Sequence, residues 1–401
     1  MSTVIGFVKR VFTALSPPAS QPSPDSKPLK FGILGAAAIA PIALISPAKN
    51  HPETVVYAVA ARDKARAAAF AKKYGIEKVY GGPTGYQELL DDPEIDAIYN
   101  PLPNGLHYEW TMKALAAGKH VLLEKPPADT AEETRQMFEL AEKKGLVLLE
   151  AFHYRFHPAI QRVKAIIDSG DLGAIKHISA TLALPKGIMK SNDIRYNYAL
   201  GGGALMDMGC YTLDCIRYLS SSNPTSVLSA NHDLHTPASA ASSFKPDVDR
   251  STTATLALPN DATASLKCDL GIPFSYGIVP SVPQVRAIVT CEGGEIDMFN
   301  FVAPTLYHSI KVTTKGANGG KTRVEKVYTF AEGKMEGKGE AWWMTYRFQL
   351  EAFVDRVKGR TPQTWVEKED SIANMHWIEQ IYAKTGLGSR PKSEFVPSQS
   401  A

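Results

Sequence analysis

Short apolar segments alternate with helical segments in the first third of the chain. Five apolar runs have the length of buried strands, and they lie at 29–36, 54–63, 95–104, 120–127 and 146–152. Helical patterns are found at 37–50, 64–75, 107–119 and 130–145. Strands that alternate with helices predict βαβ units around a parallel sheet. Ligands of such sheets bind beyond the carboxyl ends of the strands.

After residue 152 a helix and a turn are predicted at 153–173. The pattern then changes to a series of strands. They are predicted at 175–184, 227–234, 251–258, 262–270, 284–299, 306–315 and 322–330. Strands in direct succession predict an antiparallel sheet. Two amphipathic helices are predicted later in the chain, at 344–359 and 371–386.

These patterns predict an α/β protein of two domains. We expect the first domain at 29–152 and a second α/β domain, with an open, mainly antiparallel sheet, at 153–365. Residues 366–401 form a helix and tail that we expect to pack back on the first domain. Residues 1–28 form an N-terminal arm and a Pro/Ser-rich linker.

The arm has apolar residues at helical spacing: Val4, Ile5, Val8, Val11, Phe12 and Leu15. Such a helix packs on the body of the protein or on a partner subunit. A mitochondrial transit peptide is the alternative, but Arg and Ser are sparse here. We favour the packed arm and leave targeting open.

Composition narrows the classes of function. The 44 basic residues almost balance the 41 acidic ones, so the net charge is +3. This charge lacks the excess of basic residues that is typical of nucleic-acid-binding proteins. No apolar run reaches the ~20 residues of a membrane span. The 4 cysteines are too few and too irregularly spaced for a disulfide framework or a zinc site, and we expect no metal. A reducing compartment, the cytoplasm, is the simplest prediction.

The first strand-to-helix turn is a candidate dinucleotide site. Its sequence has Gly35 for a tight turn, Ala37 where a second glycine is usual, and Ala40 for close packing of helix on strand. The amino end of the following helix favours a diphosphate. An ordinary alanine-rich turn would look the same, but the position after the first strand favours a Rossmann fold. The expected cofactor contacts are Gly35, Ala36, Ala37, Ile39 and Ala40.

The end of the second strand discriminates between the two nicotinamide cofactors. Sites for NAD usually have Asp or Glu here, whereas this chain has Arg62 followed by Asp63. A guanidinium binds a phosphate through two hydrogen bonds. Arg62 therefore favours NADP over NAD, unless it is only a surface residue before a helix that Asp63 caps.

Two further strand ends carry candidate chemistry. One lies at 100–107 and the other at 124–127, where prolines fix the backbone. Lys125 would then lie beside a nicotinamide, where an ammonium can orient a hydroxyl; an exposed lysine paired with Glu124 is the alternative. The cofactor contacts expected from these ends are Asn100, Pro101, Leu102, Asn104, His107, Glu124 and Lys125.

A glycine-rich entry at 201–203 precedes a helix in the second domain. Asp207 and Tyr211 are four residues apart and share one face of this helix. A carboxylate and a phenol there can both reach a substrate hydroxyl, and a nearby ammonium would favour the phenolate. Taken alone, Asp207 could be a residue that interacts with the helix dipole, and Tyr211 a buried phenol.

The chain resembles the glucose–fructose oxidoreductase and inositol 2-dehydrogenase family of NAD(P)-dependent enzymes. The matching segments include FGILGAAAIA, AARD, GKHVLLEKP, EAFHYRFHP and GGGALMDMGCYTLD. Within the family it is similar to the NADP-dependent D-xylose 1-dehydrogenases and the dimeric dihydrodiol dehydrogenases. It departs from the pattern at Ala37, in a long loop around 232–250, and at His153, where an apolar residue is common.

The resemblance implies a Rossmann domain, and a second domain whose open sheet forms a homodimer interface. It implies hydride transfer between NADP and a hydroxyl-bearing carbon of a small molecule. Lys125 and Tyr211 would be the catalytic pair, with Asp207 as a third member that orients the substrate, and Arg155 would line the cleft.

A sugar like D-xylose, or a vicinal diol, is the expected substrate. Its polar contacts would come from Tyr154, Arg195, Tyr196, Asn197 and Asp207. The alternatives are a ketone or imine reductase, and an NADP-binding sensor without catalysis.

Overall fold

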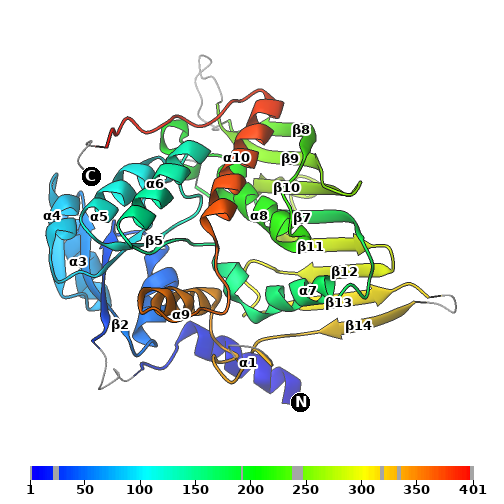
Figure 1. The fold of residues 1–401 in the computed structure, drawn as a ribbon, viewed down its shortest axis with the longest axis horizontal. Coiled ribbons are helices and arrows are strands. Elements are labelled where there is room, and N and C mark those ends of the chain that lie inside the picture. The colour runs from blue at the N-terminus through cyan, green and yellow to red at the C-terminus, as the bar shows by residue number, and fades with distance from the viewer. Residues whose placement is uncertain are drawn as a thin grey trace.

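Two domains lie side by side in the computed structural model, which describes residues 2–20, 27–190, 193–236, 247–316, 320–331 and 336–397 (Figure 1). Most of the 232–250 loop lies outside these residues. The predicted α/β fold class is confirmed: a parallel sheet forms the first domain, and a larger, mainly antiparallel sheet forms the second.

The first domain is a six-stranded parallel sheet with the order β3-β2-β1-β4-β5-β6. Its strands are β1 (Leu29–Leu34), β2 (Thr54–Ala61), β3 (Lys78–Gly81), β4 (Ala97–Asn100), β5 (His120–Leu123) and β6 (Leu148–Glu150). Its helices are α2 (Ser46–Lys49), α3 (Lys64–Tyr74), α4 (Gly85–Asp91), α5 (His107–Ala116) and α6 (Ala131–Lys143). Strand order reverses at β1, which is where such sheets bind ligands.

Two elements of this domain were not predicted. Strand β3 and helix α4 lie between the second and third predicted strands. Strand β3 is a half-buried edge strand of four residues, which is too short to show a period. The helix predicted from residue 37 begins instead at Pro41, with a five-residue π-helical turn η1 (Pro41–Ile45) before α2. Proline fits this first position because it lacks an N–H.

The second sheet has eight strands in the order β14-β13-β12-β11-β7-β10-β9-β8. They are β7 (Ile175–Pro185), β8 (Ser226–Leu234), β9 (Asp249–Ala257), β10 (Thr263–Ile272), β11 (Gln284–Cys291), β12 (Gly294–Phe299), β13 (Ser309–Thr314) and β14 (Lys321–Glu325). All neighbours are antiparallel except β7 and β10. Alternation along β7 buries Ile178 and Ala180 on one face and leaves Ser179 and Thr181 half-exposed on the other.

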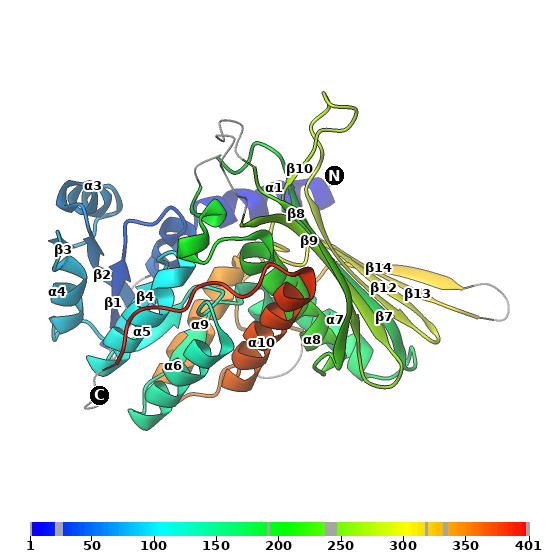
Figure 2. The same cartoon turned by 90° about the horizontal axis from the view of Figure 1, so that it is seen from above.

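Helices cover one face of this sheet and join the domains (Figure 2). They are α7 (Pro158–Asp168), α8 (Cys210–Ser220) and α10 (Lys368–Thr385). Helix α10 contacts α6 of the first domain as well as α8 and β8. Helix α9 (Thr345–Val357), which the sequence assigned to the second domain, contacts η3 (His153–Phe156) of that domain and also packs on η1 and α2 of the first.

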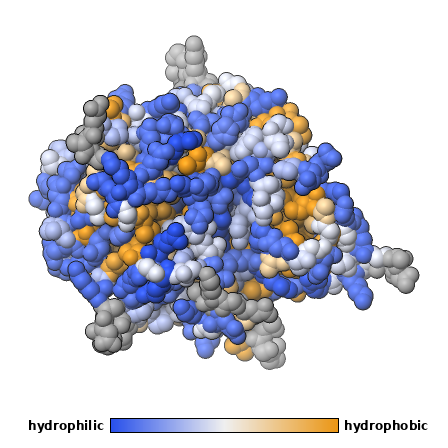
Figure 3. Space-filling model, in the orientation of Figure 1, coloured by the Kyte–Doolittle hydropathy of each residue, from blue (hydrophilic) through white to orange (hydrophobic). Residues whose placement is uncertain are grey.

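The arm forms helix α1 (Ser2–Leu15), which contacts the body of the protein through Arg10. The Arg10 guanidinium donates to the carbonyl oxygens of Thr305 and Leu306 at 3.1 and 3.3 Å and lies over the ring of Tyr328. In the part of the chain that the structure describes, no helix is long and apolar enough to cross a membrane. The face shown in Figure 3 is mostly hydrophilic, with hydrophobic residues in separate patches.

Candidate active site

The turn after β1 requires glycine at its first position. Gly35 has a φ of +89°, and a Cβ there would lie 3.3 Å from the side chain of Leu102. A side chain at this position would therefore be strained and crowded. Ala36 and Ala40 are buried, Ala37 is half-buried and Ile39 is exposed. The turn thus combines small buried residues with an open outer edge before a helical segment, as a diphosphate site requires.

Two arginines lie near this turn. Arg62 is exposed at the end of β2, and Asp63 caps α3 by accepting a hydrogen bond from the Arg66 backbone N–H at 3.0 Å. The Arg66 guanidinium donates to the carbonyl oxygen of Ala36 at 3.0 Å. Sequence reasoning missed Arg66, because only folding brings the first turn of α3 back to the loop after β1.

Asn100 and His107 hold the loops at the strand ends and are themselves fully buried. The Asn100 amide donates to the Thr111 hydroxyl at 3.1 Å and accepts from the Leu102 N–H at 3.3 Å, which fixes the loop through Pro101. The His107 ring nitrogens lie 2.8 and 2.7 Å from the carbonyl oxygens of Pro126 and Leu102. Burial lowers the pKa of His107 to about 4. The buried side chains of Asn100 and His107 therefore fix the loops that follow β4 and β5.

The adjacent Asn104 joins the two domains. Its amide donates to the carbonyl oxygen of Gly201 at 2.9 Å. On the neighbouring strand end, Glu124 is buried and accepts from the Tyr99 hydroxyl at 2.7 Å. Burial raises the pKa of Glu124. Glu124 is thus held by Tyr99, so the expected alternative of a pair with Lys125 is not what the structure shows.

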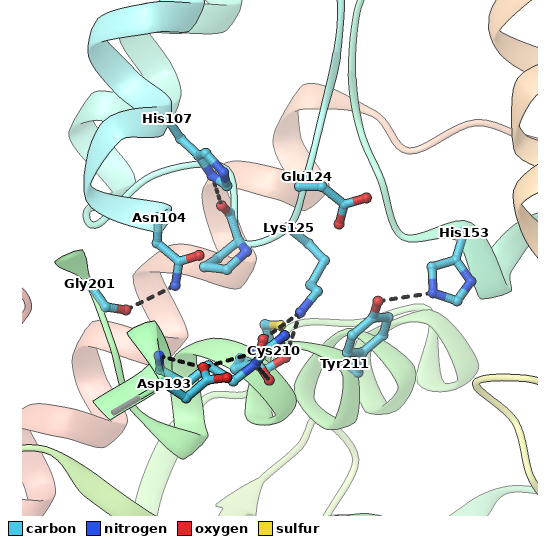
Figure 4. Close-up of polar contacts among 12 residues, drawn as sticks. Asn104, His107, Glu124, Lys125, His153, Asp193, Gly201, Cys210 and Tyr211 are labelled. Atoms are coloured by element: carbon cyan, nitrogen blue, oxygen red, sulfur yellow. Dashed lines mark hydrogen bonds and ion pairs between the residues drawn. The ribbon is translucent and has the colours of Figure 1, made fainter. Parts of the chain in front are cut away.

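Lys125 reaches across to the second domain (Figure 4). Its ammonium donates to the backbone carbonyl and the carboxylate of Asp207 at 2.8 and 3.0 Å. The other carboxylate oxygen of Asp207 accepts from Arg195 at 2.8 Å, and Arg195 also contacts Asp193 at 3.0 Å. The four side chains form a row of alternating charge between the domains.

This row keeps its charges despite burial. Burial opposes ionisation of Asp207, but Lys125 and Arg195 outweigh it and lower the pKa to about 2. Burial likewise opposes the charge of Lys125, but Asp207 outweighs it and raises the pKa. An ammonium and a carboxylate are therefore both present at neutral pH.

Tyr211 lies next to Lys125 but points its hydroxyl elsewhere. The ammonium lies 4.8 Å from the centroid of the Tyr211 ring, whereas the hydroxyl lies 3.0 Å from Nε2 of His153. Burial, followed by the neighbouring Tyr346 and Glu124, raises the pKa of Tyr211 well above its usual value. Burial therefore outweighs the stabilisation that the nearby ammonium gives to a phenolate.

Asp207 and Tyr211 come from adjoining helical segments. Asp207 lies on a five-residue π-helical turn, η6 (Leu205–Gly209), and α8 begins after it. Both residues lie beside the Lys125 ammonium, as expected for residues that share one helix face. The Tyr211 hydroxyl reaches beyond Lys125 to His153, at the start of the segment after β6.

Tyr154 and Arg155 do not belong to this group, contrary to expectation. Both are buried in the second domain, where the Tyr154 hydroxyl and the Arg155 guanidinium contact Asp214. Arg155 also pairs with Asp370 at 3.0 Å. Both residues lie on the short helix η3 (His153–Phe156), and their polar atoms bind buried partners inside the second domain.

The remaining predicted residues lie on the segment before the glycines. Arg195 and Tyr196 are half-buried and Asn197 is exposed. The Tyr196 ring stacks on His235 at 3.6 Å, so one of its faces is covered. Among the described residues, no cluster of His, Cys, Asp or Glu could hold a metal ion.

Two family models match the chain. The model for the oxidoreductase family with an NAD-binding Rossmann fold matches residues 29–152, and the model for the GFO/IDH/MocA C-terminal domain matches residues 160–297. The chain belongs to this family.

Relatives within the GFO/IDH/MocA family include enzymes of sugars and diols. The chain is 34% identical to D-xylose 1-dehydrogenase (NADP(+)) 2 from Haloferax volcanii, over 90% of this chain and 98% of that one. It is 32% identical to trans-1,2-dihydrobenzene-1,2-diol dehydrogenase from Xenopus tropicalis, over 51% of this chain and 61% of that one. A solved 3-ketoreductase from Actinomadura kijaniata, in complex with NADP and TDP-benzene, is 26% identical with a TM-score of 0.71, covering 92% and 100% of the two chains.

In this member of the GFO/IDH/MocA family, a buried ion pair holds the glycine segment that precedes Asp207. Arg390 pairs with Asp249 at 2.7 Å and donates to the carbonyl oxygen of Gly202 at 2.6 Å. Asp249 also accepts from the Leu205 N–H at 2.8 Å. A Cβ on Gly203 would lie 2.3 Å from Asp249, so this position requires glycine. Arg390 and Asp249 lie far from the motifs in sequence, and nothing in their surroundings there identifies them.

Proposed function

We propose that this protein is an NADP-dependent dehydrogenase that transfers a hydride between the nicotinamide and a hydroxyl-bearing carbon of a sugar or vicinal diol. A D-xylose-like aldose is the first candidate. The family membership supports the reaction class, and the two relatives that act on D-xylose and on a diol support the substrate class.

One observation carries the proposal. The Lys125 ammonium of the first domain lies within hydrogen-bond distance of Asp207 and over the ring of Tyr211, both from the second domain. These groups meet at the carboxyl edge of the parallel sheet, where the turn at Gly35 also lies. A proton-transfer group and a charged pair thus share the edge at which such folds bind ligands.

The residues present fit a dinucleotide. The open turn at Gly35–Ala40 would take the diphosphate, and Arg62, with Arg66 close by, would face the ribose phosphate of NADP. NADP, when bound, supplies the hydride acceptor or donor. Tyr211 accepts the proton of the substrate hydroxyl in oxidation and returns it in reduction. Lys125 donates a hydrogen bond to the oxygen of the substrate hydroxyl. Asp207, which also binds Arg195, keeps the Lys125 ammonium charged and in place.

Reduction of NADP by a panel of aldoses and diols tests the function. We expect turnover with at least one pentose or diol, measured as absorbance of NADPH. Tight NADP binding without turnover of any compound, in either direction, would contradict the proposal and favour a sensor without catalysis.

A ketone reductase of a specialised pathway is the second candidate. It is favoured by the likeness to the 3-ketoreductase, which covers 92% of this chain. Oxidation of NADPH by keto sugars, faster than reduction of NADP by any aldose or diol, would select this alternative.

Arg62→Ala is expected to reduce the preference for NADP over NAD by about tenfold or more, since a charged hydrogen bond contributes about 1.5–3 kcal/mol. The measurement is kcat/KM with each cofactor. Arg135→Ala on α6, which removes another exposed guanidinium, serves as the matched control and should leave the ratio unchanged. An unaltered ratio in the Arg62 variant would contradict the assigned role.

We further propose that the open face of the second sheet forms a homodimer. Small residues line up across it on neighbouring strands: Ser179 pairs with Ser265, and Ser265 pairs with Thr255. No described element covers this face (Figure 2). Sheets pack face to face at about 10 Å when such side chains interdigitate.

Ser179→Arg is expected to shift the protein from dimer to monomer, because a bulky charge at the centre of the face prevents close packing. Sedimentation velocity would measure the change. Gln87→Arg on α4 adds the same charge at an exposed position of the first domain and should leave the dimer intact. A wild-type protein that sediments as a monomer would contradict the proposal.

We also propose that the protein works in the cytoplasm. All four cysteines are free and buried, which agrees with a reducing compartment.

A further inference from the structure

A hydrogen-bonded chain leads away from the candidate site through His153. The Tyr211 hydroxyl lies 3.0 Å from Nε2 of His153, and Nδ1 of His153 lies 2.8 Å from the Thr345 hydroxyl (Figure 4 shows the first contact). The three residues come from α8, from η3 and from the first turn of α9.

We propose that His153 is a positioning residue that accepts the hydrogen bond of the Tyr211 hydroxyl and takes over its proton during oxidation of the substrate. The proposal rests on the proposed dehydrogenase function and deepens it. In this proposal, Thr345 holds His153 in the tautomer whose Nε2 can accept the hydrogen bond of the Tyr211 hydroxyl.

The packing leaves the imidazole little freedom. His153 and Thr345 are 4% and 2% exposed, so water does not compete for their hydrogen bonds. The ring of Tyr346 lies over His153 with centroids 4.0 Å apart, and the Tyr211 ring meets it edge-on at 5.6 Å. A buried imidazole between two hydroxyls can satisfy both nitrogens only in an ordered arrangement.

The charge state of His153 suits an acceptor. Burial, followed by the nearby Lys125 ammonium, lowers the pKa of His153 to about 3. A neutral imidazole has one N–H and one lone pair. When Nδ1–H donates to Thr345, Nε2 is left to accept from Tyr211. The lone pairs of the Tyr211 oxygen are then free to face the substrate.

The other charged and titratable groups around Tyr211 make a free phenolate unfavourable. Burial raises the pKa of Tyr211 most, and Tyr346, Glu124, Cys210 and Asp207 raise it further.

The proposed step balances. The proton of the substrate hydroxyl passes to the Tyr211 oxygen while the original Tyr211 proton passes to Nε2 of His153. The hydride leaves the carbinol carbon for the nicotinamide, so the alcohol becomes a carbonyl. His153 ends as an imidazolium that donates to Tyr211 and Thr345. It returns its extra proton to the Tyr211 oxygen, which releases a proton into the emptied site once the carbonyl product has left. Reduction runs in reverse.

Nitrogen NMR of the ligand-free protein, with labelled histidine, tests the resting state without any turnover. The His153 signals, identified by their loss in His153→Phe, should show a neutral ring protonated at Nδ1. Thr345→Val should alter this tautomer signature, while Thr345→Ser, which keeps the hydroxyl, should preserve it. A ring protonated only at Nε2 in the wild type would overturn the proposal.

A kinetic cycle tests the step itself. We expect His153→Phe to lower kcat by about tenfold or more with little change in KM, since positioned proton transfer contributes about 100- to 10,000-fold in all. Tyr211→Phe/His153→Phe should be no slower than Tyr211→Phe, because the two residues act as one unit. Losses that multiply, or a His153→Phe variant as fast as the wild type, would refute it.

Two controls keep the outcomes separate. Tyr346→Phe retains the ring over His153 and should leave kcat unchanged, which excludes an effect of packing alone. Thermal unfolding of each variant identifies any that fail to fold. If His153→Phe does not fold, kcat of Thr345→Val is compared with kcat of Thr345→Ser instead. A wild-type protein that turns over no substrate would contradict the proposed function, whereas the NMR result still decides the role of His153.

Discussion

Lys125→Met is expected to lower kcat/KM by about 100- to 10,000-fold, the range of a positioned proton-transfer group. The ammonium is the only cation that contacts both Asp207 and the ring of Tyr211 among the contacts of the described residues. Methionine keeps the length and apolar stem of lysine but removes the donor and the charge. Steady-state reduction of NADP by the best substrate measures the loss.

Binding and folding need separate measurements in this variant. NADP affinity, measured by fluorescence or calorimetry, should change little, because the turn at Gly35 and Arg62 carry the proposed cofactor contacts. Lys119→Met is the matched control: Lys119 is also buried and donates to the carbonyl oxygens of Asp92 and Ile95 at 2.8 Å each, but it lies away from the site. Its effect should fall on stability, not on kcat. Near-normal turnover in Lys125→Met would refute the catalytic role.

Arg390→Met is expected to lower the free energy of unfolding by about 3–5 kcal/mol, the cost of leaving a buried charge without its partner. The Arg390 and Asp249 side chains are both 0% exposed. Asp249 also binds the Tyr382 hydroxyl at 2.8 Å and the Leu205 N–H, so its unpaired charge would disturb the start of the helix that carries Asp207 and Tyr211. Urea unfolding would measure the change.

A surface pair provides the comparison. Arg360 is 42% exposed in its pair with Glu53 at 2.6 Å, and such pairs contribute about 0–1 kcal/mol. Arg360→Met should therefore have a much smaller effect than Arg390→Met. Equal losses in the two variants would show that burial does not set the energy of the Arg390 pair.

Motifs with local signals were predicted well. The turn at Gly35 follows an apolar strand, and Lys125 lies between a strand and two prolines, so each position can be placed from its neighbours alone. Strand β3 was missed because four half-buried residues show no clear period.

Side-chain direction was predicted less well. Asp207 and Tyr211 were expected on one helix face, and both lie beside Lys125, but the Tyr211 hydroxyl contacts His153, which was not expected. Tyr154 and Arg155 follow a strand of the first domain, yet their polar atoms turn inward to Asp214. Neither outcome can be deduced from spacing, because both depend on a short irregular helix.

The amino-acid sequence by itself determined the two sheets, the small residues of the turn after β1 and the presence of a lysine, a carboxylate and a phenol. These features depend on periodicity and on neighbours within a few residues. Only the tertiary structure decided the partners: Arg66 at Ala36, Arg390 behind Gly202, and His153 between Tyr211 and Thr345. Such contacts join segments up to 192 residues apart, and their energies come from burial, which no local pattern encodes.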